Sequence, residues 1–401
     1  LSDIDLPAPL LVESARAAIR KGDPDSARTE AMEIRRSLLG PAINATGVLL
    51  HTNLGRAPIE YSQFGRASNL EFNLATGGRG SRNSHAADLI SRLTGAESAL
   101  IVNNCSAAVI LVLAALARDR AVTVSRGELV EIGGGFRVPD VMAESGTRLV
   151  EVGTTNRTRL ADYEAAGRFH DIALSLKVHP SNYKIKGFTE ETSVRELSQL
   201  GPPVVVDIGS GFVDEACQWL KDGRPVWLRD EPAVKQTLES GASLVTFSCD
   251  KLFGGPQAGV IAGQRDLIEQ CAAHPLMRAF RPGSLILGAL QQVALAYLNR
   301  DGDSIPFWRM AQTPISELKR RAEAISAGKT ISTMSMTGGG SLPGEEIPSV
   351  GIELEGDLSA CLRQADIPVI ARVREQTTII DLRTVHPEDD ELVANAINSC
   401  F

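Results

Sequence analysis

Short apolar runs alternate with helix-like segments through the middle of the chain. The apolar runs predict strands at residues 99–102, 121–125, 148–152, 172–178, 204–208, 243–247 and 259–262. Apolar residues at helical spacing predict helices at 86–93, 106–117 and 138–145, between several of these strands. Strands that are apolar throughout and separated by helices are typical of a mostly parallel sheet that is buried on both faces. The pattern therefore predicts an α/β domain.

The pattern differs at both ends of the chain. Residues 10–21 and 26–39 predict two helices, which form a short N-terminal segment over residues 1–40. We expect the large domain to span residues 41–284. A smaller α+β domain is expected over 285–401, with helices at 285–298, 315–327, 358–365 and 390–397, strands at 350–354, 369–373 and 377–382, and a loop at 337–341.

Composition narrows the class of protein. The chain has 401 residues and a formal net charge of -8, which argues against non-specific nucleic-acid binding but leaves a local basic face possible. The six cysteines, at 105, 217, 249, 271, 361 and 400, show no C-x-x-C pair and no metal-ligand spacing, so we expect reduced thiols in a cytoplasmic protein. The longest apolar run, 107–117, is too short to cross a bilayer.

The stretch around Lys251 is the first candidate for chemistry. An apolar strand leads into Ser248, Asp250 and Lys251, and Gly254-Gly255-Pro256 then prevents regular structure. A lysine at the end of a core strand suits a Schiff-base enzyme, because partial desolvation makes the neutral amine accessible. A surface lysine at a strand end explains this segment equally well. Asp250, directly beside the lysine, is a second catalytic candidate.

Three other stretches offer groups that a phosphorylated cofactor needs. Asn104, Cys105 and Ser106 form a strand-to-helix turn whose free amides could hold a phosphate, although an ordinary capped turn is as common. Asp207 ends a buried strand and is costly to leave unpaired. A protonated pyridine nitrogen, an arginine or backbone amides would each satisfy it. The hydroxyl of Ser248 could reach the same phosphate.

Together these groups predict a pyridoxal 5'-phosphate site in an aminotransferase-like (fold type I) domain. The carboxyl ends of parallel strands are where such sheets bind ligands. Asp207 would keep the ring nitrogen protonated, and Lys251 would carry the cofactor and then move the α-proton. His179 could touch the ring, although a lone histidine more often caps structure. Glu128 lies in a polar run that could line the pocket or form an exposed turn.

Several long motifs occur in a fixed order along the chain. They are INATGVLLHTNLGRAP (43–58), VNNCSAAV (102–109), VSRGELVEIGGGFRVPD (124–140), EVGTTNRT (151–158), KVHPSNYKIKGFT (177–189), FSCDKLFGGPQAG (247–259) and HPLMRAFR (274–281). In these motifs the chain resembles the bacterial selenocysteine synthases, the L-seryl-tRNA(Sec) selenium transferases. The resemblance runs from about residue 41 to the end.

The resemblance implies a specific reaction. Lys251 falls at the Schiff-base position of a pyridoxal-phosphate enzyme that removes the hydroxyl of serine on tRNA(Sec), giving a dehydroalanyl intermediate. The enzyme then adds selenium from selenophosphate and so forms selenocysteinyl-tRNA(Sec). Arg56, Arg278 and Arg281 fall where the family binds selenophosphate, and guanidinium forks suit such an oxyanion. Ordinary salt bridges would also explain these arginines. The family forms large homo-oligomers built of dimers, with active sites usually between subunits.

Two departures from the family pattern keep other hypotheses open. About forty residues precede the matched region, fewer than the tRNA-reading segment of the family, and the chain begins with Leu1 rather than Met. Cys249 stands where glycine is expected; it could simply pack, or it could alter the pocket. A related enzyme without tRNA, carrying out β-elimination or replacement on a small amino acid or amino-sugar phosphate, is therefore the alternative. Intact Lys251 and Asp207 count against a third hypothesis, a non-catalytic scaffold.

Overall fold

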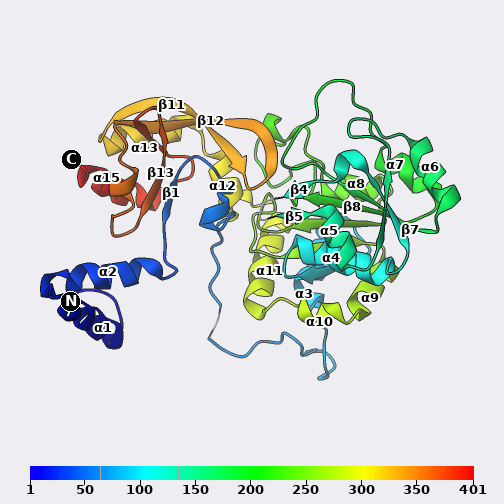
Figure 1. Cartoon of the computed structure of the whole chain (residues 1–401), viewed down its shortest axis with the longest axis horizontal. Helices are drawn as coiled ribbons and strands as arrows, with labels where there is room; N and C mark the ends of the chain where they lie inside the picture. The colour runs from blue at the N-terminus through cyan, green and yellow to red at the C-terminus, as the bar shows by residue number, and fades with distance from the viewer. Residues whose placement is uncertain (64, 133–134) are drawn as a thin grey trace.

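The computed structural model describes residues 1–63, 65–132 and 135–401. Figure 1 shows two bodies, a larger one around a seven-stranded sheet and a smaller one around a five-stranded sheet. The chain enters the smaller body, forms the larger one, and then returns to complete the smaller one. The predicted α/β domain and the smaller α+β domain are therefore both present.

The large sheet has the strand order β2-β10-β9-β8-β7-β3-β6. Neighbours from β9 to β6 run parallel, whereas β10 is antiparallel to both β2 and β9. All five positions of β9 are buried, as expected for a strand without polar alternation. The prediction of a mostly parallel sheet is confirmed. The strands are β2 (Ser98–Val102), β3 (Ala121–Ser125), β6 (Arg148–Val152), β7 (Ile172–Val178), β8 (Val204–Gly209), β9 (Leu244–Ser248) and β10 (Gly259–Gly263).

Helices cover both faces of this sheet and form two separate hydrophobic clusters. One face packs against α3 (Ser84–Thr94), α6 (Leu160–Phe169), α8 (Val234–Glu239) and α11 (Ser284–Leu298). The other face packs against α4 (Cys105–Leu116), α5 (Val138–Glu144), α9 (Arg265–Ala273) and α10 (Leu276–Ala279). A short hairpin of β4 (Glu131–Ile132) and β5 (Phe136–Arg137) and the short helices α7 (Val194–Leu197) and α12 (Pro306–Gln312) complete the body.

The small domain has a sheet in the order β1-β13-β14-β12-β11, backed by three helices. β1 (Ile43–Ala45) pairs in parallel with β13, so these residues, predicted to lie in the large domain, belong to the smaller sheet. The sequence also missed β11 (Lys329–Gly338), because its alternating Ser, Thr and Met residues lack a continuous apolar run. The other elements are β12 (Ser341–Glu355), β13 (Val369–Arg374), β14 (Thr377–Asp381), α13 (Ile315–Ile325), α14 (Ser359–Leu362) and α15 (Asp390–Asn398).

The N-terminal segment forms a helical pair beside the small domain (Figure 1). Helices α1 (Ala8–Lys21) and α2 (Ala27–Ser37) pack on each other around Ile4, Leu6 and Ala31. Arg36 at the end of α2 donates a hydrogen bond to the carbonyl oxygen of Gln364, 3.0 Å away. Among the described residues, the structure contains no helix with the length and apolar character that a membrane crossing needs.

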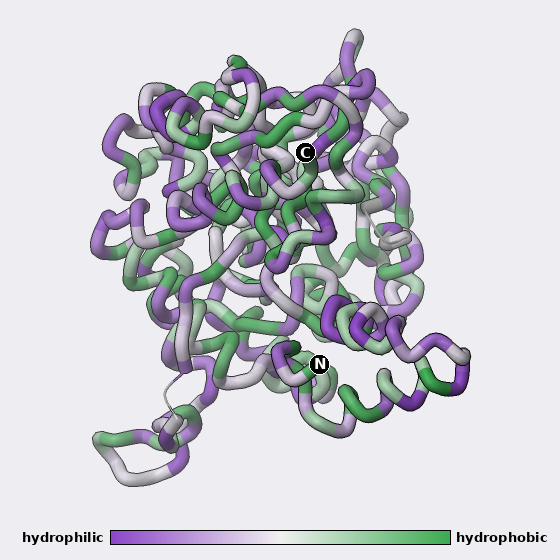
Figure 2. Tube along the Cα trace, turned by 90° about the vertical axis from the view of Figure 1, so that its left-hand side faces the viewer, coloured by the Kyte–Doolittle hydropathy of each residue, from purple (hydrophilic) through white to green (hydrophobic). Residues whose placement is uncertain are grey.

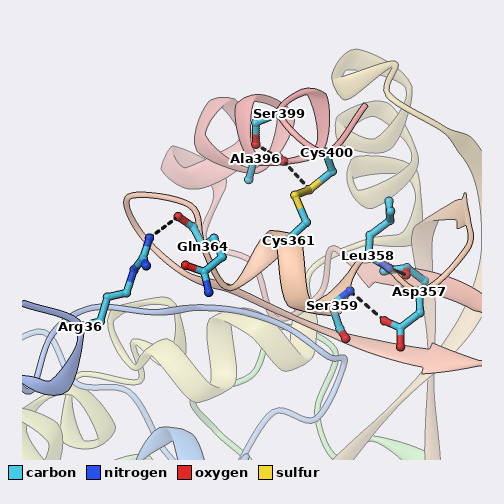
Figure 3. The surroundings of a disulfide bond; sticks show 10 residues. Arg36, Asp357, Leu358, Ser359, Cys361, Gln364, Ala396, Ser399 and Cys400 are labelled. Atoms are coloured by element: carbon cyan, nitrogen blue, oxygen red, sulfur yellow. Dashed lines mark hydrogen bonds between the residues drawn. A yellow bond between two sulfur atoms is a disulfide. The ribbon is translucent and has the colours of Figure 1, made fainter. Parts of the chain in front are cut away.

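The cysteines are not all free thiols. Cys361 on α14 and Cys400 after α15 form a disulfide, shown in Figure 3, which ties the C-terminal helix to the body of the small domain. This pair contradicts the expectation of reduced cysteines, which rested on the absence of close spacing in the sequence. The two cysteines are 39 positions apart in the sequence, yet their Cα atoms lie 5.8 Å apart because two helices of one small domain meet there.

Candidate active site

Lys251 lies in the turn that follows β9, at the carboxyl end of the parallel strands. Its side chain is buried, with 6 % of its surface exposed. The Nζ atom lies over the end of β8, 3.9 Å from the position that a Cβ on Gly209 would occupy. Gly209 has a φ of +72°, so a glycine both adopts this turn easily and leaves open space in front of the amine.

Asp207 on β8 is a buried carboxylate beside this lysine. Its Oδ1 accepts hydrogen bonds from Thr246 Oγ1 at 3.0 Å and from Cys105 Sγ at 3.2 Å. Burial raises the pKa of Asp207, while these two hydrogen bonds and the charges of Lys251 and His179 oppose the rise. A cationic group in front of Asp207 would stabilise its charged form.

This environment predicts how the stability of the cofactor-free protein depends on pH. A carboxyl group whose pKa is higher in the folded state binds more protons there, so it lowers stability as pH rises past its ordinary value of 3.8. Asp207→Asn keeps an acceptor for Thr246 and Cys105 but carries no charge. We expect this variant, without cofactor, to be more stable than wild type by about 1–3 kcal/mol at neutral pH. The difference should vanish in acid below the ordinary carboxyl pKa. Thermal unfolding at both pH values measures this, and equal unfolding temperatures at neutral pH would contradict it.

The turn from β2 into α4 lies beside Asp207, because Cys105 at the start of the helix donates a hydrogen bond to that carboxylate. α4 begins at Cys105, and the side chain of Asn104 accepts a hydrogen bond from the Ala107 amide at 2.8 Å. The Asn104 backbone crosses β10 so closely that a Cβ on Gly259 would lie 2.1 Å from the Asn104 carbonyl oxygen. A residue with a side chain would clash there, so Gly259 allows the backbone at the start of α4 to lie directly against β10. Ser106, in the first turn, is partly exposed.

Asp250 and Ser248 form a network with Arg56. Asp250 Oδ1 accepts a hydrogen bond from Ser248 Oγ at 2.5 Å, and its Oδ2 pairs with Arg56 Nη1 at 2.6 Å. The carbonyl oxygen of Asp250 also accepts a hydrogen bond from the Ala57 amide. Both carboxylate oxygens of Asp250 are thus engaged. Ser248, expected to reach a phosphate, has its hydroxyl turned to Asp250.

Arg278 and Arg281 lie on α10 and just after it. Arg278 is exposed, and Arg281 Nη1 lies 3.6 Å from Glu71 Oε1. Of the three arginines predicted to bind substrate, Arg56 is thus paired with Asp250 and Arg281 with Glu71.

His179 follows β7 and links Asp207 to a carboxylate that the sequence did not single out. Its amide donates a hydrogen bond to the Asp207 carbonyl oxygen at 2.9 Å, and its Nε2 lies 3.6 Å from Oε2 of Glu231. Both residues line a cavity of about 410 Å³. Glu231 follows an ordinary polar turn, Leu228-Arg-Asp-Glu231, so no sequence signal marked it.

Two further residues have structural roles. Glu128 is buried and accepts hydrogen bonds from Lys177 Nζ at 2.9 Å and from the Val178 amide at 2.8 Å. Burial raises the pKa of Glu128, with the Lys177 charge opposing it. Cys249 is fully buried in the hydrophobic core, and burial together with Asp250 raises the pKa of its thiol well above the ordinary value. Packing, one of its two expected roles, therefore accounts for Cys249.

Comparison with known proteins decides the family. The family model described as L-seryl-tRNA selenium transferase matches residues 42–386. The chain belongs to the L-seryl-tRNA selenium transferase family. It is 46% identical over 395 residues to the L-seryl-tRNA(Sec) selenium transferase of Moorella thermoacetica, covering 91% of this chain and 82% of that protein. The enzyme of the same name from Geobacter metallireducens is 42% identical over 406 residues, covering 93% of this chain and 84% of that protein. The resemblance seen in the motifs is confirmed.

A solved structure supports the fold. The structure of D-glucosaminate-6-phosphate ammonia-lyase covers 90% of this chain and 96% of its own, with a TM-score of 0.60 and 22% identity. At this identity the match concerns the fold alone, and it agrees with the sheet and the two-domain arrangement described above.

The residues at the strand ends fit pyridoxal 5'-phosphate, the cofactor of this transferase fold. A buried lysine, a buried carboxylate and free amides at a helix start are the three groups that the amine linkage, the ring nitrogen and the phosphate require. Lys251, Asp207 and the turn at Asn104 supply them from three strands that end at the same edge of the sheet.

Proposed function

We propose that the protein converts L-seryl-tRNA(Sec) into selenocysteinyl-tRNA(Sec) with pyridoxal 5'-phosphate as cofactor and selenophosphate as selenium donor. The observation that carries the proposal is that buried Lys251 and buried Asp207 lie at the same end of the parallel sheet, where the lysine charge acts on the pKa of Asp207, in a chain 46% identical to a named transferase of this kind. When bound, the cofactor acts as an electron sink for the carbon that loses its proton.

Each residue around Lys251 would have its own role in the proposed reaction. Lys251 Nζ would hold the cofactor and, once released, take the α-proton of the seryl group and return it later. Asp207 would hold the protonated ring nitrogen in place, and the amides after Asn104 would hold the cofactor phosphate. Asp250, held by Ser248, would orient Arg56 toward the open side of the site.

Arg56 would bind selenophosphate together with Arg278 and Arg281. Because Arg281 pairs with Glu71 on the loop of residues 65–83, we propose that these arginines meet across a subunit boundary. The protein would then be a homo-oligomer built of dimers. Residues 65–83 support this, because they leave the large domain as an extended loop (Figures 1 and 2) that carries exposed Phe72 and Leu74. Light scattering of the purified protein measures this, and a monomer would contradict it.

The direct test uses purified protein with bound cofactor, seryl-tRNA(Sec) and selenophosphate. We expect conversion of the esterified serine into selenocysteine, detected by mass spectrometry after the ester is hydrolysed. Free serine and seryl-tRNA(Ser) are the matched controls and should give no product. Release of ammonia or a keto acid from small amino acids or amino-sugar phosphates, with no product on tRNA, would favour the alternative lyase. We place the reaction in the cytoplasm, where aminoacyl-tRNA is used; cell fractionation tests this.

A further inference from the structure

A cavity lined by His179 lies next to the proposed cofactor site of Lys251, Asp207 and Asn104. It opens at the carboxyl ends of β3 and β7, where Ser125 and His179 line it, and it has a volume of about 410 Å³. His179 joins the wall of this cavity to Asp207, because its amide donates a hydrogen bond to the Asp207 carbonyl oxygen at 2.9 Å. A group linked to a substrate on the cofactor could therefore extend directly into this space.

Glu231 supplies a buried acceptor that the protein itself does not satisfy. Only 2 % of Glu231 is exposed, and its Oε2 faces His179 Nε2 at 3.6 Å. Its Oε1 is buried and has no hydrogen-bond partner in the described part of the chain. Because an unsatisfied buried acceptor is costly and rare, the site is suited to a ligand that donates a hydrogen bond.

The charges around the cavity are of both signs. Besides Glu231, the wall includes Glu190, Glu191 and Asp230, and also Arg157, Lys184 and Lys186. Glu190 pairs with Arg159, Glu191 with Lys177 and Lys184 with Glu345. A phosphate directly beside Glu231 would be repelled, so the group that meets its Oε1 must be a hydrogen-bond donor, which a hydroxyl can supply.

The remaining wall suits a flat ring. Pro180, Ile185, Leu342 and Pro343 offer apolar surface. Tyr183 also lines the cavity, and its hydroxyl donates to the Gly127 carbonyl oxygen, which holds the aromatic ring in one position. Nucleobases stack on aromatic and apolar side chains of this kind.

We propose that this cavity binds the 3'-terminal nucleoside of the aminoacyl-tRNA and that Glu231 Oε1 accepts a hydrogen bond from its free ribose hydroxyl. The proposal rests on the proposed function, because it assumes an aminoacyl ester at the cofactor. The ester occupies one of the two neighbouring ribose hydroxyls, and the other remains a neutral donor. His179 lies against the second oxygen of the same carboxylate, at 3.6 Å, and so leaves Oε1 as the oxygen without a partner in the described part of the chain.

The first experiment removes the hydroxyl and the acceptor separately and together. Seryl-tRNA(Sec) ending in a deoxyadenosine that lacks the free hydroxyl should raise KM of the wild-type holoenzyme about ten- to a hundredfold. Glu231→Met, which keeps the side-chain volume but has no oxygen acceptor, should raise KM similarly and respond no further to the deoxy substrate. Equal additional losses in wild type and variant, or no effect of the deoxy substrate on wild type, would overturn the proposal.

The second experiment needs no selenium transfer, so it separates this inference from the proposed function. The visible absorbance of the bound cofactor is titrated with seryl-adenosine and with serine methyl ester. We expect wild type to respond to seryl-adenosine at a concentration at least tenfold lower, and Glu231→Met to lose that preference. Glu239→Met, at an exposed carboxylate near the end of α8, should keep it. An equal response of wild type to both esters would exclude the nucleoside site even if the transferase reaction proceeds.

Discussion

Replacing Lys251 by alanine should abolish turnover, with a loss of at least about 10⁴-fold. The amine has two tasks in the proposed reaction, since it holds the cofactor and then moves the α-proton. Its neighbours offer no substitute, because Asp207 is engaged by Thr246 and Cys105, and Asp250 is engaged by Ser248 and Arg56. We expect the purified variant to lose the visible absorbance of the lysine-linked cofactor.

The covalent link itself can be located. Borohydride reduction of the wild-type holoenzyme should leave the cofactor label on Lys251, as read by peptide mass spectrometry. Lys235→Ala is a matched control, because Lys235 is a partly exposed lysine that pairs with Asp214 at 3.1 Å. This variant should keep both the label and the activity. A label on any lysine other than Lys251 would remove the basis of the proposed function.

Replacing Asp207 by asparagine should lower kcat by about 10²–10³-fold while the protein still folds. The amide can accept the hydrogen bonds of Thr246 and Cys105 through the same oxygen, so the local packing is preserved. It carries no charge, however, and cannot stabilise a protonated ring nitrogen. The carbon that loses its proton would then lack an effective electron sink.

Thr246→Val distinguishes the effect of the Asp207 charge from the effect of the hydrogen bond that Thr246 donates to it. This variant removes one hydrogen bond, of 3.0 Å, but leaves the carboxylate in place. Its kcat should fall no more than about tenfold, in keeping with the modest net value of one hydrogen bond. Steady-state kinetics and the absorbance maximum of the cofactor measure both effects. Equal losses in Asp207→Asn and Thr246→Val would show that the charge is not what matters.

The hydrophobic pattern was informative where burial was complete. The strands β2, β3, β9 and β10 were predicted because almost all of their residues are buried and most are apolar. β11 was missed because much of it is exposed, so its residues include Ser and Thr. The pairing of β1 with β13 could not be predicted, because it joins residues more than three hundred positions apart.

The residues of the candidate site also differ in whether the sequence alone could indicate them. Lys251, Asp207 and Asn104 were found because a polar residue at the end of a buried strand is unusual in the sequence. The contacts of Asp250 and Ser248 became clear only from the structure, in which Ser248 donates to Asp250 and Asp250 pairs with Arg56. Glu231 was not found, since a glutamate in a polar turn looks exposed until the fold buries it against His179.

By itself, then, the sequence determined the order of strands and helices, the cofactor chemistry at the strand ends and the family, because local polarity and ordered motifs are written in consecutive residues. Only the tertiary structure decided which distant residues meet: the disulfide of Cys361 with Cys400, the placement of β1 in the small domain and the cavity around Glu231. These depend on how separate elements pack in space, and the free energy of that packing comes from burial that no single segment contains.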